Sequence, residues 1–167
     1  MTIVNKVAQS GIITLDLEEL MLPGDRVLFD IKSWLFEELI LREKDFREEV
    51  SKHDWSQYQD KFVALTCTAD AIVQTWAYML IAVNLLPYAK KIVYGDLVEL
   101  EKVLFQQQIA DLNPEDYRDQ RVVIKGCSSR QVPISAYVEL TSFLSPLVKS
   151  VMYGEPCSTV PVFKRKA

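Results

Sequence analysis

Histidine, cysteine, glycine and proline are all scarce in this sequence, and the scarcity excludes several kinds of site. The 167 residues include one His, three Cys, five Gly and seven Pro. A single histidine excludes metal centres that need several histidines from one chain. No Gly-x-Gly-x-x-Gly, Walker-type, Gly-x-Ser-x-Gly or His-Glu-x-x-His motif occurs, so neither the common phosphate-binding loops nor the common hydrolase motifs are predicted.

Long hydrophobic runs are also missing. The longest unbroken apolar run is Trp76 to Val83, which is far shorter than the roughly 20 residues of a membrane-spanning helix. Met1 to Ser10 lacks the apolar core of a signal peptide. We therefore expect a cytoplasmic protein without a membrane anchor, whose odd set of three thiols is kept reduced.

Positive charge is not in excess. The 19 Lys and Arg residues are outnumbered by 23 Asp and Glu residues, which gives a net charge of -4. This balance argues against a nucleic-acid partner. With 49% hydrophobic and 25% charged residues, the composition is typical of one soluble domain over residues 1–167, and we expect no internal repeat.

The pattern along the chain alternates between strand and helix. Alternating or continuous apolar residues predict strands at 11–17, 27–31, 62–67, 91–95 and 121–126, and an edge strand at 158–163. Helices are predicted from Ser33 to Val50, from a Thr68 or Asp70 cap to Leu86, from an Asp96 cap to Leu112, and from Pro133 to Gly154 with a kink or break at Pro146. Ser51 to Asp60 is expected to be a loop. This order predicts an α/β protein, a single three-layer domain with a mostly parallel sheet in a Rossmann-like or flavodoxin-like arrangement.

Crossover rules allow the strand at 62–67 to lie between the strands at 91–95 and 121–126. The strand order would then reverse between Cys67 and Cys127, at the sheet edge where open α/β sheets usually bind ligands.

Three cysteines and the histidine form the first candidate site. Cys67 and Cys127 each follow a predicted strand and precede a helix, where the helix N-terminus favours a thiolate. Cys157 lies on a return loop that could reach the same end. Together with His53 they make a Cys3His set, which suits zinc or an iron-sulfur centre, with Cys67, Cys127, Cys157 and His53 as the metal ligands.

Two alternatives stay open. Free cysteines are often buried as small apolar side chains, and the chain would then be a non-enzymatic interaction or adaptor protein, with the aromatic loop around Trp55 and Tyr58 exposed to a protein partner or a second copy. In the other alternative, Ser128, Ser129 and Arg130 at a helix N-terminus hold a phosphate or carboxylate, with Asp70 as a further polar group of the site. Ordinary helix capping explains the same serines and Asp70.

Five motifs together resemble one family. They are His53–Asp60 (HDWSQYQD), Ala64–Ala71 (ALTCTADA), Thr75–Met79 (TWAYM), Val122–Ser128 (VVIKGCS) and Gly154–Val162 (GEPCSTVPV). With them the chain is similar, over nearly its whole length, to the uncharacterised bacterial domain-of-unknown-function family numbered 2480. The family carries no established activity and no assigned catalytic residue. Its members tend to be encoded near iron-sulfur assembly genes, so the resemblance implies a metal-binding or sulfur-handling role.

Overall fold

The computed structural model describes residues 5–6, 11–126, 131–155 and 157–167. The chain divides into two compact units. Unit 1 consists of Met1–Leu22 and Lys102–Ala167, and unit 2 of Pro23–Glu101. The chain therefore leaves unit 1 after its first strands, completes unit 2 and then returns. The prediction of a single domain stays a prediction.

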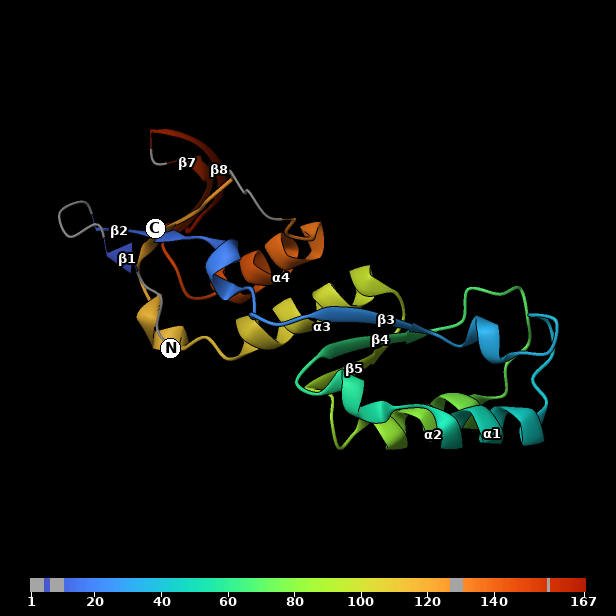
Figure 1. Cartoon of the computed structure of the whole chain (residues 1–167). Coiled ribbons are helices and arrows are strands. Elements are labelled where there is room, and N and C mark those ends of the chain that lie inside the picture. The colour runs from blue at the N-terminus through green and yellow to red at the C-terminus, as the bar shows by residue number, and fades with distance from the viewer. Residues whose placement is uncertain (1–4, 7–10, 127–130, 156) are drawn as a thin grey trace. The chain divides into compact units, whose positions relative to one another are not determined.

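Unit 2 is built on a three-stranded parallel sheet in the order β3-β4-β5, with two crossover helices (Figure 1). Its elements are β3 (Arg26–Asp30), α1 (Glu43–Lys52), β4 (Phe62–Thr66), α2 (Thr75–Leu85) and β5 (Lys91–Tyr94), with short 3-10 helices at Ile31–Trp34 and Trp55–Tyr58. Both helices lie on the same side of this sheet (Figure 1), as right-handed connections between adjacent parallel strands require. Their inner faces are apolar, and Phe46, Ala77 and Ile81 are fully buried there.

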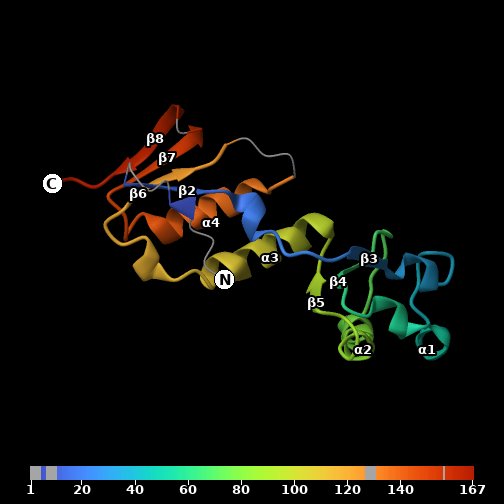
Figure 2. The same ribbon diagram turned by 60° about the vertical axis from the view of Figure 1, so that its left-hand side comes forward.

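Unit 1 is built on a five-stranded mixed sheet in the order β1-β2-β6-β7-β8. The three inner strands are parallel, and each outer strand is antiparallel to its neighbour. The elements are β1 (Asn5–Lys6), β2 (Ile12–Leu15), β6 (Arg121–Ile124), α4 (Ile134–Leu144), β7 (Ser150–Glu155) and β8 (Ser158–Lys164), with 3-10 helices at Leu17–Leu20 and Pro114–Asp116. Helix α3 (Leu97–Ala110) begins in unit 2 and continues into unit 1, and α4 runs along one face of the sheet (Figure 2).

The two units are repeats of one motif. Strands β3, β4 and β5 with helices α1 and α2 correspond to strands β2, β6 and β7 with the second half of α3 and α4. From Leu41 to Asp96, each residue of unit 2 has its counterpart 59 positions later in the chain. The identical pairs include Phe46 and Phe105, Tyr58 and Tyr117, Ala77 and Ala136, Tyr78 and Tyr137, Leu85 and Leu144, Pro87 and Pro146, Tyr94 and Tyr153, and Gly95 and Gly154.

The repeat extends to local backbone structure. Asp60 and Asp119 each lie two residues before a strand, and each has a φ of 59°. This is the left-handed region that few non-glycine residues occupy. The N–H of Asp60 donates to the carbonyl of Tyr88 at 2.9 Å, and that of Asp119 donates to the carbonyl of Leu147 at 2.9 Å. Both hydrogen bonds fix the start of the middle strand against the end of the second crossover helix. The expectation of no internal repeat is therefore wrong.

The α/β class with mostly parallel strands is confirmed. The Rossmann-like or flavodoxin-like arrangement is not confirmed, because the described strands form two sheets. Strand β4 lies between β3 and β5 rather than next to β6, so the predicted order reversal between Cys67 and Cys127 is wrong. The cause is that β3 pairs with all five residues of β4, while β2 pairs with β6.

Several predicted boundaries also change. The helix predicted from Ser33 begins only at Glu43, because Glu37 and Glu38 have φ values of 52° and 57° and form a tight turn. Within the predicted loop 51–60, the chain forms the end of α1 and a short 3-10 helix.

Helix α2 begins at Thr75, so neither Thr68 nor Asp70 caps it; the Thr68 N–H instead donates to Asp30. Helix α4 ends at Leu144, before Pro146, and Gly154 lies inside β7 rather than at a helix end. The predicted Asp96 cap is confirmed, because its carboxylate accepts the Glu99 N–H at 2.9 Å. The edge strand near the C-terminus is confirmed as β8. None of the helices in the described ranges is long and apolar enough to span a membrane.

Candidate functional site

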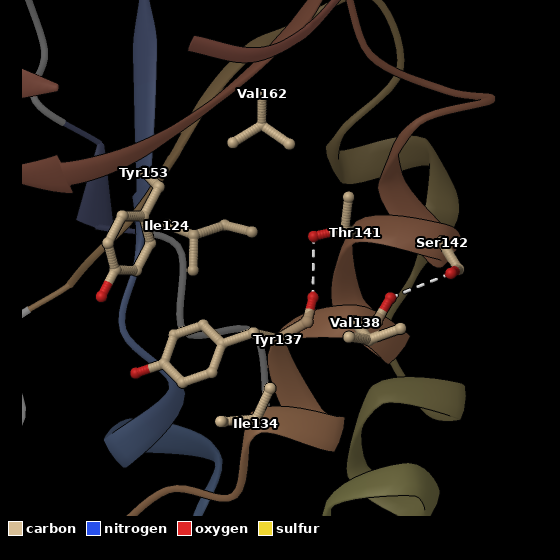
Figure 3. A pocket seen from close by; sticks show the side chains of 8 residues that line it. All are labelled: Ile124, Ile134, Tyr137, Val138, Thr141, Ser142, Tyr153 and Val162. Carbon is tan, nitrogen blue, oxygen red and sulfur yellow. Dashed lines mark hydrogen bonds between the residues drawn. The ribbon is translucent and has the colours of Figure 1, made fainter. Parts of the chain in front are cut away.

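A groove of about 480 Å³ opens on unit 1 between α4 and the strands β6, β7 and β8 (Figure 3). Helix α4 packs on the inner strands through Ala136, Leu140 and Leu144, and Val162 of β8 also lines the groove. The groove is lined by Ile124, Ile134, Tyr137, Val138, Thr141, Ser142, Tyr153 and Val162. Its volume lies in the range of small-molecule sites.

The polar side chains of the groove are largely satisfied by the protein itself. The Thr141 hydroxyl donates to the carbonyl of Tyr137 at 2.7 Å, and the Ser142 hydroxyl donates to the carbonyl of Val138 at 2.9 Å (Figure 3). The Tyr153 hydroxyl donates to the carbonyl of Gly126 at 3.3 Å. These groups have little hydrogen bonding left to offer, so the walls are effectively apolar.

Tyr137 is the polar group best placed to act on a ligand. Its ring meets the ring of Tyr153 edge to face, with centroids 6.0 Å apart. Burial raises the pKa of the Tyr137 hydroxyl, and Tyr153, Asp16 and Glu18 raise it further. The phenol therefore keeps its proton at neutral pH and can donate a hydrogen bond.

Two acidic groups, Asp16 and Glu18, act on Tyr137. Asp16 follows β2, and its carboxylate is 3.1 Å from the ammonium of Lys125. The hydrogen bond that Lys125 donates to Asp16 raises the pKa of the Lys125 ammonium group. The carboxylates of Asp16 and Glu18 both contribute to the raised pKa of Tyr137.

Unit 2 repeats the tyrosine pair at the equivalent place. Tyr78 and Tyr94 meet edge to face with centroids 5.2 Å apart. Burial, followed by Cys67, Tyr94 and Asp30, raises the pKa of Tyr78 to about 12. Unit 2 has no strand equivalent to β8 among its described residues, so the outer wall of the groove is missing there.

The structure places two of the three candidate cysteines, and they belong to different units. Cys67 is half-buried at the end of β4 and packs against the core of unit 2. Cys157 is exposed next to β8 of unit 1. Cys127 lies outside the described residues, so the structure does not test whether the three sulfurs meet.

His53 has a structural environment within unit 2. It ends α1, and its Nε2 is 2.8 Å from the hydroxyl of Tyr58. The ring packs against the rings of Phe29, Trp34 and Trp55. Burial lowers the pKa of His53, which favours the neutral ring in the folded protein.

The same cluster corrects the expectation of an exposed aromatic loop. Tyr58 is buried, and Trp55 is half-buried and stacks on Phe29. Burial raises the pKa of the Tyr58 hydroxyl, and Asp54 raises it further. These aromatic side chains form the core of unit 2 instead of a docking loop.

No group of three or more His, Cys, Asp or Glu side chains that could hold a metal ion occurs in the part of the chain that the structure describes. The Cys3His ligand set stays a prediction. Ser128, Ser129 and Arg130 of the predicted anion site lie outside the described residues. Asp70 is exposed on a bend before α2.

Sequence reasoning missed the groove and its tyrosines. The missed signal is the repeat itself: Ala-Tyr recurs at positions 77–78 and 136–137, and Tyr-Gly recurs at 94–95 and 153–154. Each tyrosine pair is formed by the first turns of the second crossover helix and the end of the last parallel strand.

The fold and the groove define an α/β protein with an apolar groove on unit 1. Residues 1–165 match the family described as "Protein of unknown function (DUF2480)", and the chain belongs to that family. The resemblance found from the sequence motifs is thereby confirmed. No curated protein and no solved structure matches the chain.

Proposed function

We propose that the protein binds a small, neutral, mainly apolar molecule in the groove of unit 1. The observation that carries this proposal is the wall chemistry: the side chains are apolar or already hydrogen-bonded within the protein. An apolar ligand would displace water that the walls hold poorly, which favours binding.

Tyr137 favours a ligand that carries one hydrogen-bond acceptor. Its protonated hydroxyl can donate to a carbonyl or ether oxygen. The nearby carboxylates of Asp16 and Glu18 favour a neutral acceptor over an anionic one. The ligand class is therefore an acyl or aromatic body that carries an uncharged oxygen.

Competitive displacement of a neutral fluorescent probe tests this function. N-phenyl-1-naphthylamine fluoresces more strongly in an apolar site, and decan-2-one and decanoate serve as competitors. We expect the ketone to displace the probe at lower concentration than the carboxylate. Tyr137→Phe should weaken the ketone by about 2- to 12-fold, the range of one neutral hydrogen bond, and leave the probe unaffected.

Matched variants locate the binding. Val138→Glu places a charge in the groove and should abolish probe binding. Met79→Glu makes the same change at the equivalent position of unit 2, with similar exposure of 63% against 61% for Val138, and should leave binding intact. Equal probe affinity in Val138→Glu and the unaltered protein would refute the proposal.

We propose separately, from the sequence, that the cysteines have a metal-binding or sulfur-handling role. This role is supported by the Cys3His set of possible ligands and by the family resemblance. Metal and labile-sulfide content of anaerobically purified protein tests it. Near-stoichiometric metal that is lost in Cys127→Ser would support a thiolate centre, and its absence after reconstitution would reject one.

A further inference from the structure

The surface of unit 2 around α2 and β5 is unusually apolar. Helix α2 carries no charged residue over its 11 positions. Met79, Val83 and Leu86 lie on its outer side with exposed fractions of 63%, 67% and 72%, and Tyr94 of β5 is 70% exposed. We call these four residues the α2 face. Met79, Val83 and Leu86 follow one another at helical spacing, and exposed apolar side chains grouped in this way mark an interaction site.

Strand β5 beside this face has a free edge. Within the described residues it is hydrogen-bonded to β4 alone. The Lys90 N–H points to β4, where it donates to the carbonyl of Lys61 at 2.8 Å. Because backbone groups alternate along a strand, the N–H groups of Lys91 and Val93 point to the outer edge.

The repeat shows which element suits such an edge. In unit 1 the equivalent strand, β7, is bonded on its outer side by β8, which runs antiparallel to it. Tyr153 of β7 pairs there with Val160, so the tyrosine equivalent to Tyr94 lies opposite a β-branched side chain. By this analogy the edge of β5 fits an antiparallel strand that presents an apolar residue to Tyr94.

We propose that this strand is β5 of a second copy of the chain, in a symmetric dimer centred on Val93. Antiparallel pairing about a two-fold axis places Val93 opposite the partner's Val93. Ile92 then lies opposite the partner's Tyr94, which reproduces the apolar pairing of Tyr153 with Val160. The two three-stranded sheets become one sheet of six strands.

Charge and helix packing agree with this register. The two lysines at the start of each β5, Lys90 and Lys91, approach the end of the other β5, which Asp96 follows. The two-fold axis stands perpendicular to the sheet, because antiparallel edges join with their faces preserved. Both α2 helices therefore lie on the same face of the six-stranded sheet, next to each other across the axis. This dimer is independent of ligand binding in unit 1.

Association is tested with the full chain. Sedimentation equilibrium should show a dimer, with a dissociation constant that rises at least tenfold in Met79→Glu and stays unchanged in Val138→Glu, its counterpart in unit 1. A chain that remains monomeric up to about 100 μM would overturn the proposal.

The register has its own test. In a background with all three cysteines replaced by Ser, Val93→Cys should form an intermolecular disulfide, since Cα atoms about 5.5 Å apart in a hydrogen-bonded antiparallel pair suit the bond. Met152→Cys, the equivalent position in the interior of the other sheet, should not crosslink. Equal crosslinking of the two variants would refute this register.

Hydrogen exchange of the unaltered protein tests the dimer without any variant, so the test holds even if the variants do not fold. The amides of Lys91 and Val93 should exchange at least tenfold more slowly at high protein concentration than at low concentration. Exchange of these amides that is independent of concentration would contradict the dimer.

Discussion

The ring of Tyr137 meets the ring of Tyr153 edge to face, with planes at 78°. Such pairs contribute about 0.5–1.5 kcal/mol beyond the area that they bury. In a double-mutant cycle with Tyr137→Leu and Tyr153→Leu, we expect a coupling of this size in the free energy of unfolding. Tyr78 and Tyr94 should give a coupling of the same sign, and a coupling near zero in both cycles would contradict the role assigned to these pairs.

Protonation of His53 should lower stability in mild acid. Burial holds the pKa of the folded-state ring below its ordinary value of 6.5. The unfolded chain therefore binds the proton more readily, so the contribution to stability is complete above about pH 6.5 and is lost as the pH falls toward the folded-state pKa. Urea unfolding between pH 7 and 5 should show this loss, and His53→Gln should flatten the curve. A curve unchanged by His53→Gln would show that other groups cause the loss.

Gly154 should resist substitution more than Gly11. Gly154 has a φ of +127°, and an added Cβ would approach the Ser158 carbonyl oxygen to 2.5 Å. Gly11 has a φ of +63° with no atom within 4 Å of that position. We expect Gly154→Ala to cost about 3 kcal/mol, because strain and a backbone clash coincide there, and Gly11→Ala to cost about 1 kcal/mol for the left-handed conformation alone. Thermal unfolding of the two variants measures the difference, and the reverse order would contradict the β7–β8 geometry.

The two described thiols should differ in reactivity. Cys157 is exposed, whereas Cys67 is half-buried and packs against the core of unit 2. In a Cys127→Ser background, alkylation followed by peptide mass spectrometry should modify Cys157 at least tenfold faster, because access limits the reaction. Similar rates would show that the end of β4 opens readily.

Much of the fold could be predicted because periodicity reports which faces are buried. The continuous apolar runs at β4 and β6 and the Asp96 cap gave the correct element types. Strand order could not be predicted in the same way. The run at Arg26–Asp30 and the alternation at Ile12–Leu15 each suit any parallel neighbour, and only tertiary packing decides that β3 joins β4 while β2 joins β6.

The candidate site was harder to predict for a different reason. The reactive residue types of the sequence point to Cys67, Cys127, Cys157 and His53. The groove is instead formed by tyrosines and aliphatic side chains that any core contains. Tyr137 and Tyr153 become informative only once their counterparts, Tyr78 and Tyr94, are recognised. The repeat is seen only when the chain is aligned with itself at an offset of 59 residues, because few of the identical positions are adjacent in sequence.

The insertion of unit 2 between β2 and β6 dictates an order of events during synthesis. Arg26 of β3 pairs with Phe62 of β4, and every strand of unit 2 is synthesised before β6. Ile12 of β2, by contrast, pairs with Arg121, which is 109 positions later. Unit 2 can therefore fold first, while the edge of β2 that pairs with β6 stays unpaired until these distant segments meet. Slow translation across the segment after α3 would prolong that exposure, and the nascent chain is then most open to misassociation.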